Sequence, residues 1–170
     1  EPLLIAGVGT YALEMLEDQP ALDAIFVPIG GGSGAAGVSI VVRALSPKTQ
    51  VIGVQSERSP AAYESWKRRS LVKAPNLTLA EGLSTGTAFE LPQLMLRELL
   101  DDFVLVSDEE ILRAMAWMVE RAHTLAEAAG AAPLAAAYRM REQLAGKRVG
   151  IVCSGGNTSL AHLRQALQTV

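Results

Sequence analysis

The chain has 170 residues, 49% of them apolar, and a formal net charge of −3 at neutral pH. That length corresponds to about one domain, and the apolar content is sufficient for one sizeable core. Because acidic and basic residues are interspersed and no apolar run approaches the roughly 20 residues that span a bilayer, we expect neither a nucleic-acid nor a membrane partner.

The chain contains a single cysteine, Cys153, which excludes an internal disulfide framework and is typical of a reducing, cytoplasmic compartment. We expect Cys153 to be inert packing at the end of a buried strand, and His123 and His162 to be surface or boundary residues rather than metal ligands. The sequence opens at Glu1 inside an apparently structured pattern, so we expect residues 1–170 to be a single domain and the C-terminal fragment of a longer protein.

Strand and helix patterns alternate along the chain. The first apolar segment, residues 3–10, leads into a short helix for which Thr10 is the predicted N-cap, with Leu13 and Leu16 facing inward. Four short apolar runs are predicted buried strands: residues 24–29, 51–54, 103–106 and 149–153. Helices are predicted at residues 35–45, from Ser59-Pro60, after Leu91-Pro92, after the capping box at residues 107–110, from Glu127, and around Leu160, Leu163 and Leu167.

This alternation predicts an α/β fold of three layers, with a mostly parallel sheet and helices on both faces. Ligands in such folds bind at the carboxyl ends of the strands. Two glycine-rich turns fall there, at residues 30–34 and 154–156. Between them lies a long irregular stretch, residues 70–90, and a loop of that length inside one domain is more often functional than idle.

The first glycine turn joins a predicted strand directly to a predicted helix. Gly30, Gly31, Gly32, Ser33 and Gly34 would expose backbone N–H groups beside a helix N-terminus, which favours an anion, usually a phosphate. The alternative is a tight loop that uses glycine only for positive φ. No Gly-Lys-Ser/Thr follows, so the turn is not a P-loop, and Glu57 is only a poor candidate for a ribose-binding acid. The turn therefore suggests a phosphate but not the molecule that carries it.

Five motifs, in order, resemble the C-terminal part of fold-type II pyridoxal-phosphate enzymes of the threonine/serine dehydratase and serine racemase group. The resemblance covers essentially the whole chain, and in three motifs a residue differs from the family pattern. Val8 replaces a glutamine, Ser33 stands where many members have a fourth glycine, and Ala128 stands where the family pattern has a glycine. The motifs are Ile5-Ala6-Gly7-Val8-Gly9-Thr10, the stretch from Val27 to Gly34, Ala80-Glu81-Gly82-Leu83, Glu127-Ala128-Ala129-Gly130-Ala131, and Cys153-Ser154-Gly155-Gly156-Asn157.

The resemblance implies pyridoxal 5'-phosphate as cofactor and assigns roles to particular residues. The turn at residues 30–34 would cradle the phosphate, Gly82 and Glu127 would lie beside the ring, and Ser154 with Gly155 would face the pyridine nitrogen. A neutral hydroxyl there leaves that nitrogen largely unprotonated, which the resemblance links to β-elimination. From the residues alone, Ser154 is equally a cap or turn residue and Glu127 a first-turn acid favoured by the helix dipole.

A pyridoxal-phosphate enzyme also needs a Schiff-base lysine. None of the four lysines, Lys48, Lys67, Lys73 and Lys147, lies in the family's Ser-x-Lys-x-Arg-Gly setting, and the substrate-carboxylate loop is also absent. We therefore predict no catalytic residue in this chain: it would supply half of the active site of an L-threonine or L-serine ammonia-lyase. A missing N-terminal segment or partner chain would supply the other half, and the resemblance implies a homodimer.

Some members of the family bind a divalent cation beside this region. When the chain is aligned through Tyr63, the family's glutamate falls at Gln55 and its aspartate at Ala61, so the resemblance implies that both carboxylates are lost. Hard cations prefer charged oxygen ligands, and we expect no metal site.

Two functions of other classes stay open. The chain could be a non-catalytic regulatory module that binds a nucleotide or another phosphate, or an assembly part that completes its site only with a partner. Within the enzyme interpretation, dehydratases, racemases and β-replacement enzymes share this half, so the sequence does not select the substrate.

Overall fold

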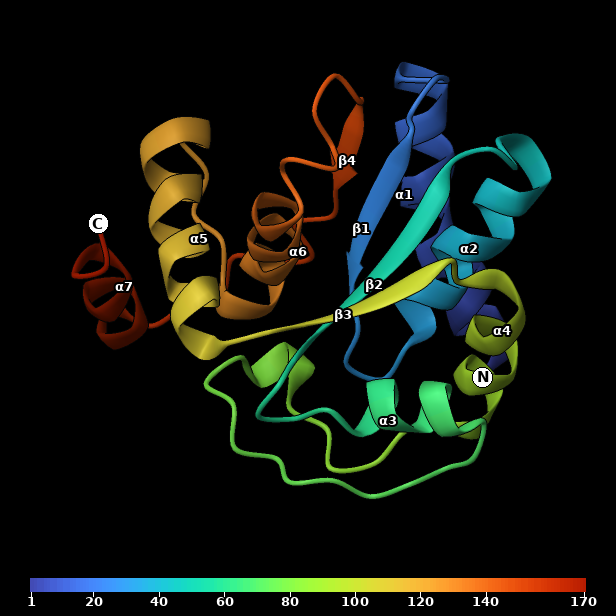
Figure 1. Ribbon diagram of the computed structural model, residues 1–170, viewed down its shortest axis with the longest axis horizontal. Coiled ribbons are helices and arrows are strands. Elements are labelled where there is room, and N and C mark those ends of the chain that lie inside the picture. The colour runs from blue at the N-terminus through green and yellow to red at the C-terminus, as the bar shows by residue number, and fades with distance from the viewer.

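Four parallel strands form one sheet, in the order β3-β2-β1-β4 (Figure 1). The computed structural model describes residues 1–170, and the sheet consists of β1 (Ala24–Pro28), β2 (Gln50–Ser56), β3 (Asp102–Val106) and β4 (Val149–Ile151). Ala24 at the start of the central strand β1 lies opposite Gln50 on one side and Val149 on the other, so these strands begin in register and, being parallel, point their carboxyl ends toward the same edge of the sheet. The predicted α/β class with a parallel sheet is confirmed.

Helices cover both faces of the sheet, as Figure 1 shows, with α1, α2 and α4 on one side and α5, α6 and α7 on the other. None of these helices combines the length and the apolar character that a membrane span requires. Their bounds are α1 Pro2–Asp18, α2 Ser33–Leu45, α3 Ala61–Arg68, the 3₁₀ turn η1 Glu81–Leu83, α4 Glu90–Leu99, α5 Asp108–Ala122, α6 Ala128–Arg139 and α7 Leu160–Leu167.

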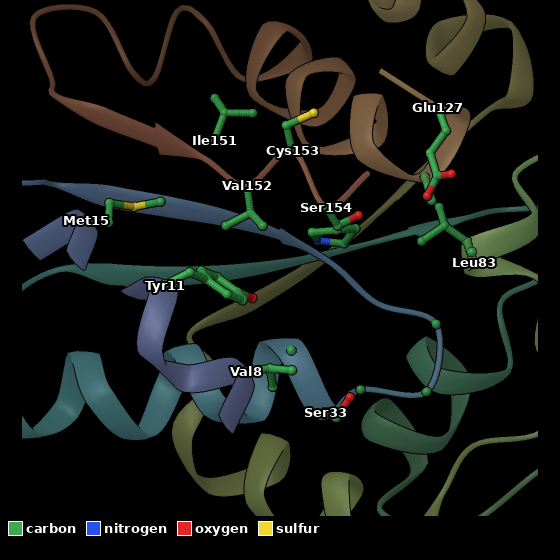
Figure 2. A pocket seen from close by; sticks show the side chains of 17 residues that line it. Val8, Tyr11, Met15, Ser33, Leu83, Glu127, Ile151, Val152, Cys153 and Ser154 are labelled. Atoms are coloured by element: carbon green, nitrogen blue, oxygen red, sulfur yellow. The ribbon is translucent and has the colours of Figure 1, made fainter. Parts of the chain in front are cut away.

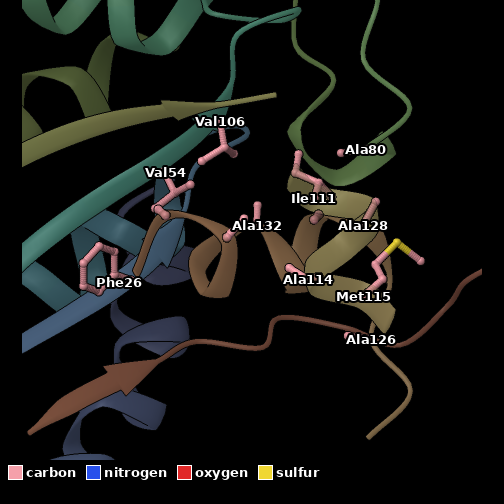
Figure 3. Packing of buried hydrophobic residues seen from close by; sticks show 14 of the residues in the cluster. Phe26, Val54, Ala80, Val106, Ile111, Ala114, Met115, Ala126, Ala128 and Ala132 are labelled. Atoms are coloured by element: carbon pink, nitrogen blue, oxygen red, sulfur yellow. The ribbon is translucent and has the colours of Figure 1, made fainter. Parts of the chain in front are cut away.

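The strand β1 separates two buried clusters because its side chains alternate between the two faces. Phe26 belongs to the cluster that α5 and α6 complete, whereas Ile25 and Val27 belong to the cluster that α1 and α2 complete, and all three are fully buried. Figure 3 shows the first cluster, in which the alanine-rich helix α6 fits closely between the sheet and α5. Its small side chains let the helix begin directly behind the carboxyl ends of the strands.

The N-terminal helix differs from the sequence prediction. α1 is continuous from Pro2, so Thr10 is not an N-cap; its hydroxyl donates to the carbonyl of Gly7 within the helix (2.8 Å). The absence of side chains at Gly9 and Gly37 allows α1 to approach α2 closely, since a Cβ on Gly37 would lie 2.9 Å from the nitrogen of Gly9. Leu16 is buried as predicted, but Leu13 is exposed.

The C-terminal region is more exposed than predicted. β4 has only three residues, all half-buried, because it is the edge strand and pairs with β1 alone. Cys153, predicted to be buried packing, is exposed just beyond that strand. In α7 the buried residue is Ala166, whereas Leu160 and Leu167 are exposed.

Candidate functional site

A cavity of about 640 Å³ lies at the carboxyl ends of the strands, and both glycine turns line it (Figure 2). Its volume lies within the roughly 300–1,000 Å³ of small-molecule sites. Of the residues predicted to bind a cofactor, the structure brings eight to this cavity and places Gly155 directly behind its wall. The eight are Gly30, Gly31, Gly32, Ser33, Gly34, Gly82, Glu127 and Ser154.

The first glycine turn presents an uncapped helix N-terminus to the cavity. Gly32 adopts φ +93°, in the left-handed region that only glycine enters at little cost, and turns the chain directly into α2. No side chain caps this helix, so the N–H groups of its first turn have no intrahelical acceptor. Ser33 adds a half-buried hydroxyl. Backbone donors and the helix dipole together form an anion-binding geometry.

Close backbone contacts join the segments around the cavity, and glycine is required at each of them. A Cβ on Gly30 would collide with the carbonyl oxygen of Gly82. One on Gly82 would lie 2.7 Å from the side chain of Ala129, and one on Gly130 would lie 2.7 Å from the carbonyl oxygen of Gly155. The first turn, η1, the start of α6 and the second turn thus form one packed unit.

Ser154 and Glu127 lie on the side of the cavity away from α1, and Figure 2 shows both beside the open space. Ser154 follows β4 and is exposed to the cavity. Glu127 is the residue before α6; its N–H donates to the carbonyl of Gly155 (3.0 Å), and its carboxylate makes no capping bond. A Cβ on Gly155 would lie 2.7 Å from Oε1 of Glu127, so this carboxylate lies against the second turn.

Sequence reasoning missed Asp108, which fixes the long segment after α3. Its carboxylate accepts hydrogen bonds from the hydroxyls of Ser56 (2.9 Å) and Thr78 (2.6 Å) and from the N–H of Leu79 (3.0 Å). The segment that carries Gly82 is therefore bound to the ends of β2 and α5. The partners lie 29 to 52 residues away, so no local pattern predicts them.

The helix α1 supplies a further wall that the sequence analysis did not assign, formed by Val8, Tyr11 and Met15. Their spacing would have identified the wall if a continuous helix had been predicted. Burial raises the pKa of Tyr11 to about 12. Among the lining residues Glu127 is the one carboxylate, and none is a lysine or arginine.

The position considered for a divalent cation is occupied by an amide. Gln55 is fully buried at the end of β2, and its Oε1 accepts a hydrogen bond from the N–H of Tyr63 (3.1 Å). The chain contains no group of three or more His, Cys, Asp or Glu residues placed to hold a metal ion.

Comparisons with known proteins identify related sequences and related structures. The profile of the family described as "Pyridoxal-phosphate dependent enzyme" matches residues 1–155. The L-threonine ammonia-lyase of Thermotoga maritima is 37% identical over 158 residues, which is 92% of this chain and 39% of that relative.

Solved structures share the fold. The processed form of threonine deaminase isoform 2 from Solanum lycopersicum matches with a TM-score of 0.94 at 26% identity, covering 100% of this chain and 50% of its own. The serine racemase from Dictyostelium discoideum matches with a TM-score of 0.84 at 35% identity, covering 92% of this chain and 51% of its own. The chain thus spans about half the length of these proteins or less.

Proposed function

Because the chain belongs to the family of pyridoxal-phosphate-dependent enzymes, we propose that it forms the phosphate- and ring-binding half of an ammonia-lyase acting on a small hydroxy amino acid, L-threonine or L-serine. The observation that carries this proposal is that residues of both glycine turns line the same cavity. The name of the Thermotoga relative supports the reaction class.

The residues of the cavity fit a flat phosphorylated ring. The uncapped N-terminus of α2 and the hydroxyl of Ser33 would hold the phosphate, while Gly82 leaves room for the ring because it has no side chain. When bound, pyridoxal phosphate acts as an electron sink for bonds at the α-carbon of an amino acid. Ser154 would donate a hydrogen bond from Oγ to the ring nitrogen and keep its own proton, since a serine hydroxyl is not an acid at neutral pH.

We propose that the lysine that holds the cofactor covalently comes from a segment outside this chain. Lys48 and Lys147 precede β2 and β4, at the edge of the sheet opposite the cavity. Lys67 lies over the ring of Tyr63 on α3, and Lys73 forms an isolated bridge with Thr87. The longer relatives leave ample length for a lysine-bearing segment.

An apolar groove of about 670 Å³ beside β4 fits this segment. It is lined by Ile151 of β4, the rings of Trp117 and Tyr138, which touch at a tilt of 54° (centroids 4.4 Å apart), and neighbouring residues of α5 and α6. The strand β4 pairs with β1 alone, so its other edge has free backbone groups. A segment that packed here would lie beside the wall of the cavity that Ile151 also lines.

The proposal is tested with the purified chain. Pyridoxal phosphate should raise the melting temperature, because a ligand of the folded state stabilises it by mass action, whereas AMP should not. Threonine turnover should be absent from the chain alone and appear when a lysine-bearing segment is supplied. A shift with AMP but not with pyridoxal phosphate would favour the regulatory module, and robust turnover by the chain alone would contradict the half-site.

We further propose that the complete enzyme is cytoplasmic and forms a homodimer. A cytoplasmic enzyme is supported by the single free cysteine. A homodimer is proposed from the family resemblance, and sedimentation equilibrium of the chain with its completing segment would test it.

A further inference from the structure

Tyr11 reaches the anion-binding turn from a different element. A Cβ on Gly34 would lie 3.2 Å from the Tyr11 hydroxyl, so that oxygen lies next to the first turn of α2. Figure 2 shows the ring extending from α1 into the cavity, with its hydroxyl between Ser154 and Ser33. The residue is neither a glycine of the turn nor part of any motif identified in the sequence.

The position of this ring is fixed by the packing of two helices. α1 and α2 meet backbone to backbone, since a Cβ on Gly37 would lie 2.7 Å from the carbonyl oxygen of Ile5 and 2.9 Å from the nitrogen of Gly9. Gly37 lies one turn beyond the start of α2, and Tyr11 follows Gly9 by two residues. The hydroxyl is therefore held at a set place relative to the N-terminus of α2.

The O–H group of Tyr11 is a hydrogen-bond donor for which this chain provides no acceptor. Tyr11 is half-buried and lines the cavity, and its hydroxyl makes no hydrogen bond to another residue, so it can donate to a molecule bound there. The lining that this chain supplies contains no lysine or arginine, so the donors that it offers to an anion are backbone N–H groups and neutral hydroxyls. Each such donor then matters more than in a site with a fixed positive charge.

We infer that Tyr11 is a phosphate-binding residue, whose hydroxyl donates a hydrogen bond to a phosphate oxygen held at the N-terminus of α2. The inference rests on the proposed function and deepens it: the phosphate would be gripped from two elements, the turn before α2 and the face of α1. Val8 and Met15 flank the ring on the same helix face and give it an apolar surround.

The protonation state of Tyr11 suits this role. Burial raises its pKa to about 12, so the phenol keeps its proton at every pH at which the protein would work. A neutral phenol donates to a phosphate oxygen, whereas a phenolate would repel the phosphate dianion.

The test compares the purified chain with Tyr11→Phe, which removes the hydroxyl and keeps the ring, and with Tyr63→Phe as a matched control on α3. Three probes are used: pyridoxal 5'-phosphate, pyridoxal, and inorganic phosphate. Tyr11→Phe should weaken binding of the two phosphate-containing probes about tenfold and leave pyridoxal unchanged, while Tyr63→Phe should change none. The ³¹P resonance of bound pyridoxal phosphate should also shift in Tyr11→Phe and not in the control.

The outcomes separate the two proposals. If the unaltered chain binds pyridoxal phosphate and Tyr11→Phe binds it equally well with an unchanged ³¹P resonance, the role of Tyr11 is wrong and the proposed function stands. Equal weakening of pyridoxal and pyridoxal phosphate would also overturn it, because the hydroxyl would then serve the shape of the cavity. If the unaltered chain binds neither phosphate-containing probe, both proposals fail.

Discussion

Single glycines determine whether the two turns can share one cavity. Gly30 rests on the carbonyl of Gly82, and Gly130 rests on that of Gly155, so backbone touches backbone at these points. The close approach leaves no room for a methyl group. A side chain at such a position would separate the segments that line the cavity.

We predict that Gly30→Ala lowers the free energy of unfolding by about 2 kcal/mol or more, because the new methyl group collides with the carbonyl oxygen of Gly82. Binding of pyridoxal phosphate should be lost with it. The control is Gly7→Ala in α1, where no atom lies within 4 Å of the new Cβ. That variant should gain about 0.5–1 kcal/mol from helix propensity and keep the ligand. Urea denaturation and ligand titration of both variants would check this, and a stable, binding-competent Gly30→Ala would contradict it.

Asp108 provides a second prediction at this scale. In Asp108→Asn one carboxylate oxygen becomes an NH₂ group, which must face either the N–H of Leu79 or the hydroxyls of Ser56 and Thr78. We expect a loss of about 1–3 kcal/mol and faster amide hydrogen exchange at residues 76–84. Glu109→Gln, at the next position and exposed, should change stability by less than about 0.5 kcal/mol. Unchanged exchange at residues 76–84 would show that Asp108 does not hold the segment.

At the scale of elements, the sequence predicted well where the signal is local. The capping box at Ser107 is present, with its hydroxyl accepting from the N–H of Glu110 (3.2 Å) and the Glu110 carboxylate accepting from the N–H of Ser107 (2.8 Å). The strand–glycine–helix unit around residues 30–34 also formed as expected. Both depend on residues a few positions apart.

The errors arose where a distant contact decides the structure. α1 runs through Gly7 and Gly9 because α2 lies against it, and the sequence of α1 alone does not show that neighbour. The helix predicted from Ser59-Pro60 begins only at Ala61, with Pro60 at the cap position, because the Ser59 hydroxyl donates to Oδ1 of the distant Asn76 (2.7 Å) instead of capping the helix. For the same reason Asp108 and Tyr11 could not be assigned from the sequence, since their partners belong to other elements.

The start of α5 allows a prediction about pH. Burial alone would raise the pKa of Glu110, but hydrogen bonds from Arg139 and Ser107, together with the charge of Arg139, lower it below the ordinary 4.5. A carboxyl group whose pKa is lower in the folded than in the unfolded chain stabilises the fold at pH values above its unfolded-chain pKa. This stabilisation is lost as the pH falls through its folded-chain pKa. Glu110→Gln should therefore cost about 0.5–1 kcal/mol at pH 7, and the difference should shrink on acidification below pH 4.5. Denaturation curves at several pH values would check this; a constant difference down to pH 3 would contradict it.

For the whole molecule, the surface beside β4 decides how the half-site is completed. If a lysine-bearing segment packs into the groove of Ile151, Trp117 and Tyr138, it must cover Trp117. The other tryptophan, Trp66, lies in the opposite layer against Phe103, and its indole donates to the carbonyl of Leu96 (3.0 Å). The two indoles therefore report on different faces of the sheet.

We predict that in Trp66→Phe, where Trp117 is the one remaining tryptophan, emission shifts to shorter wavelength when the part of the Thermotoga relative that this chain does not match is added as a separate polypeptide. Pyridoxal phosphate alone should leave this emission unchanged, because Trp117 does not line the cavity. In Trp117→Phe, Trp66 should show no shift on addition of that polypeptide. Restored threonine turnover without a shift in Trp117 emission would mean that the segment completes the cavity from another side, since a strand paired with the free edge of β4 could not leave the groove open to water.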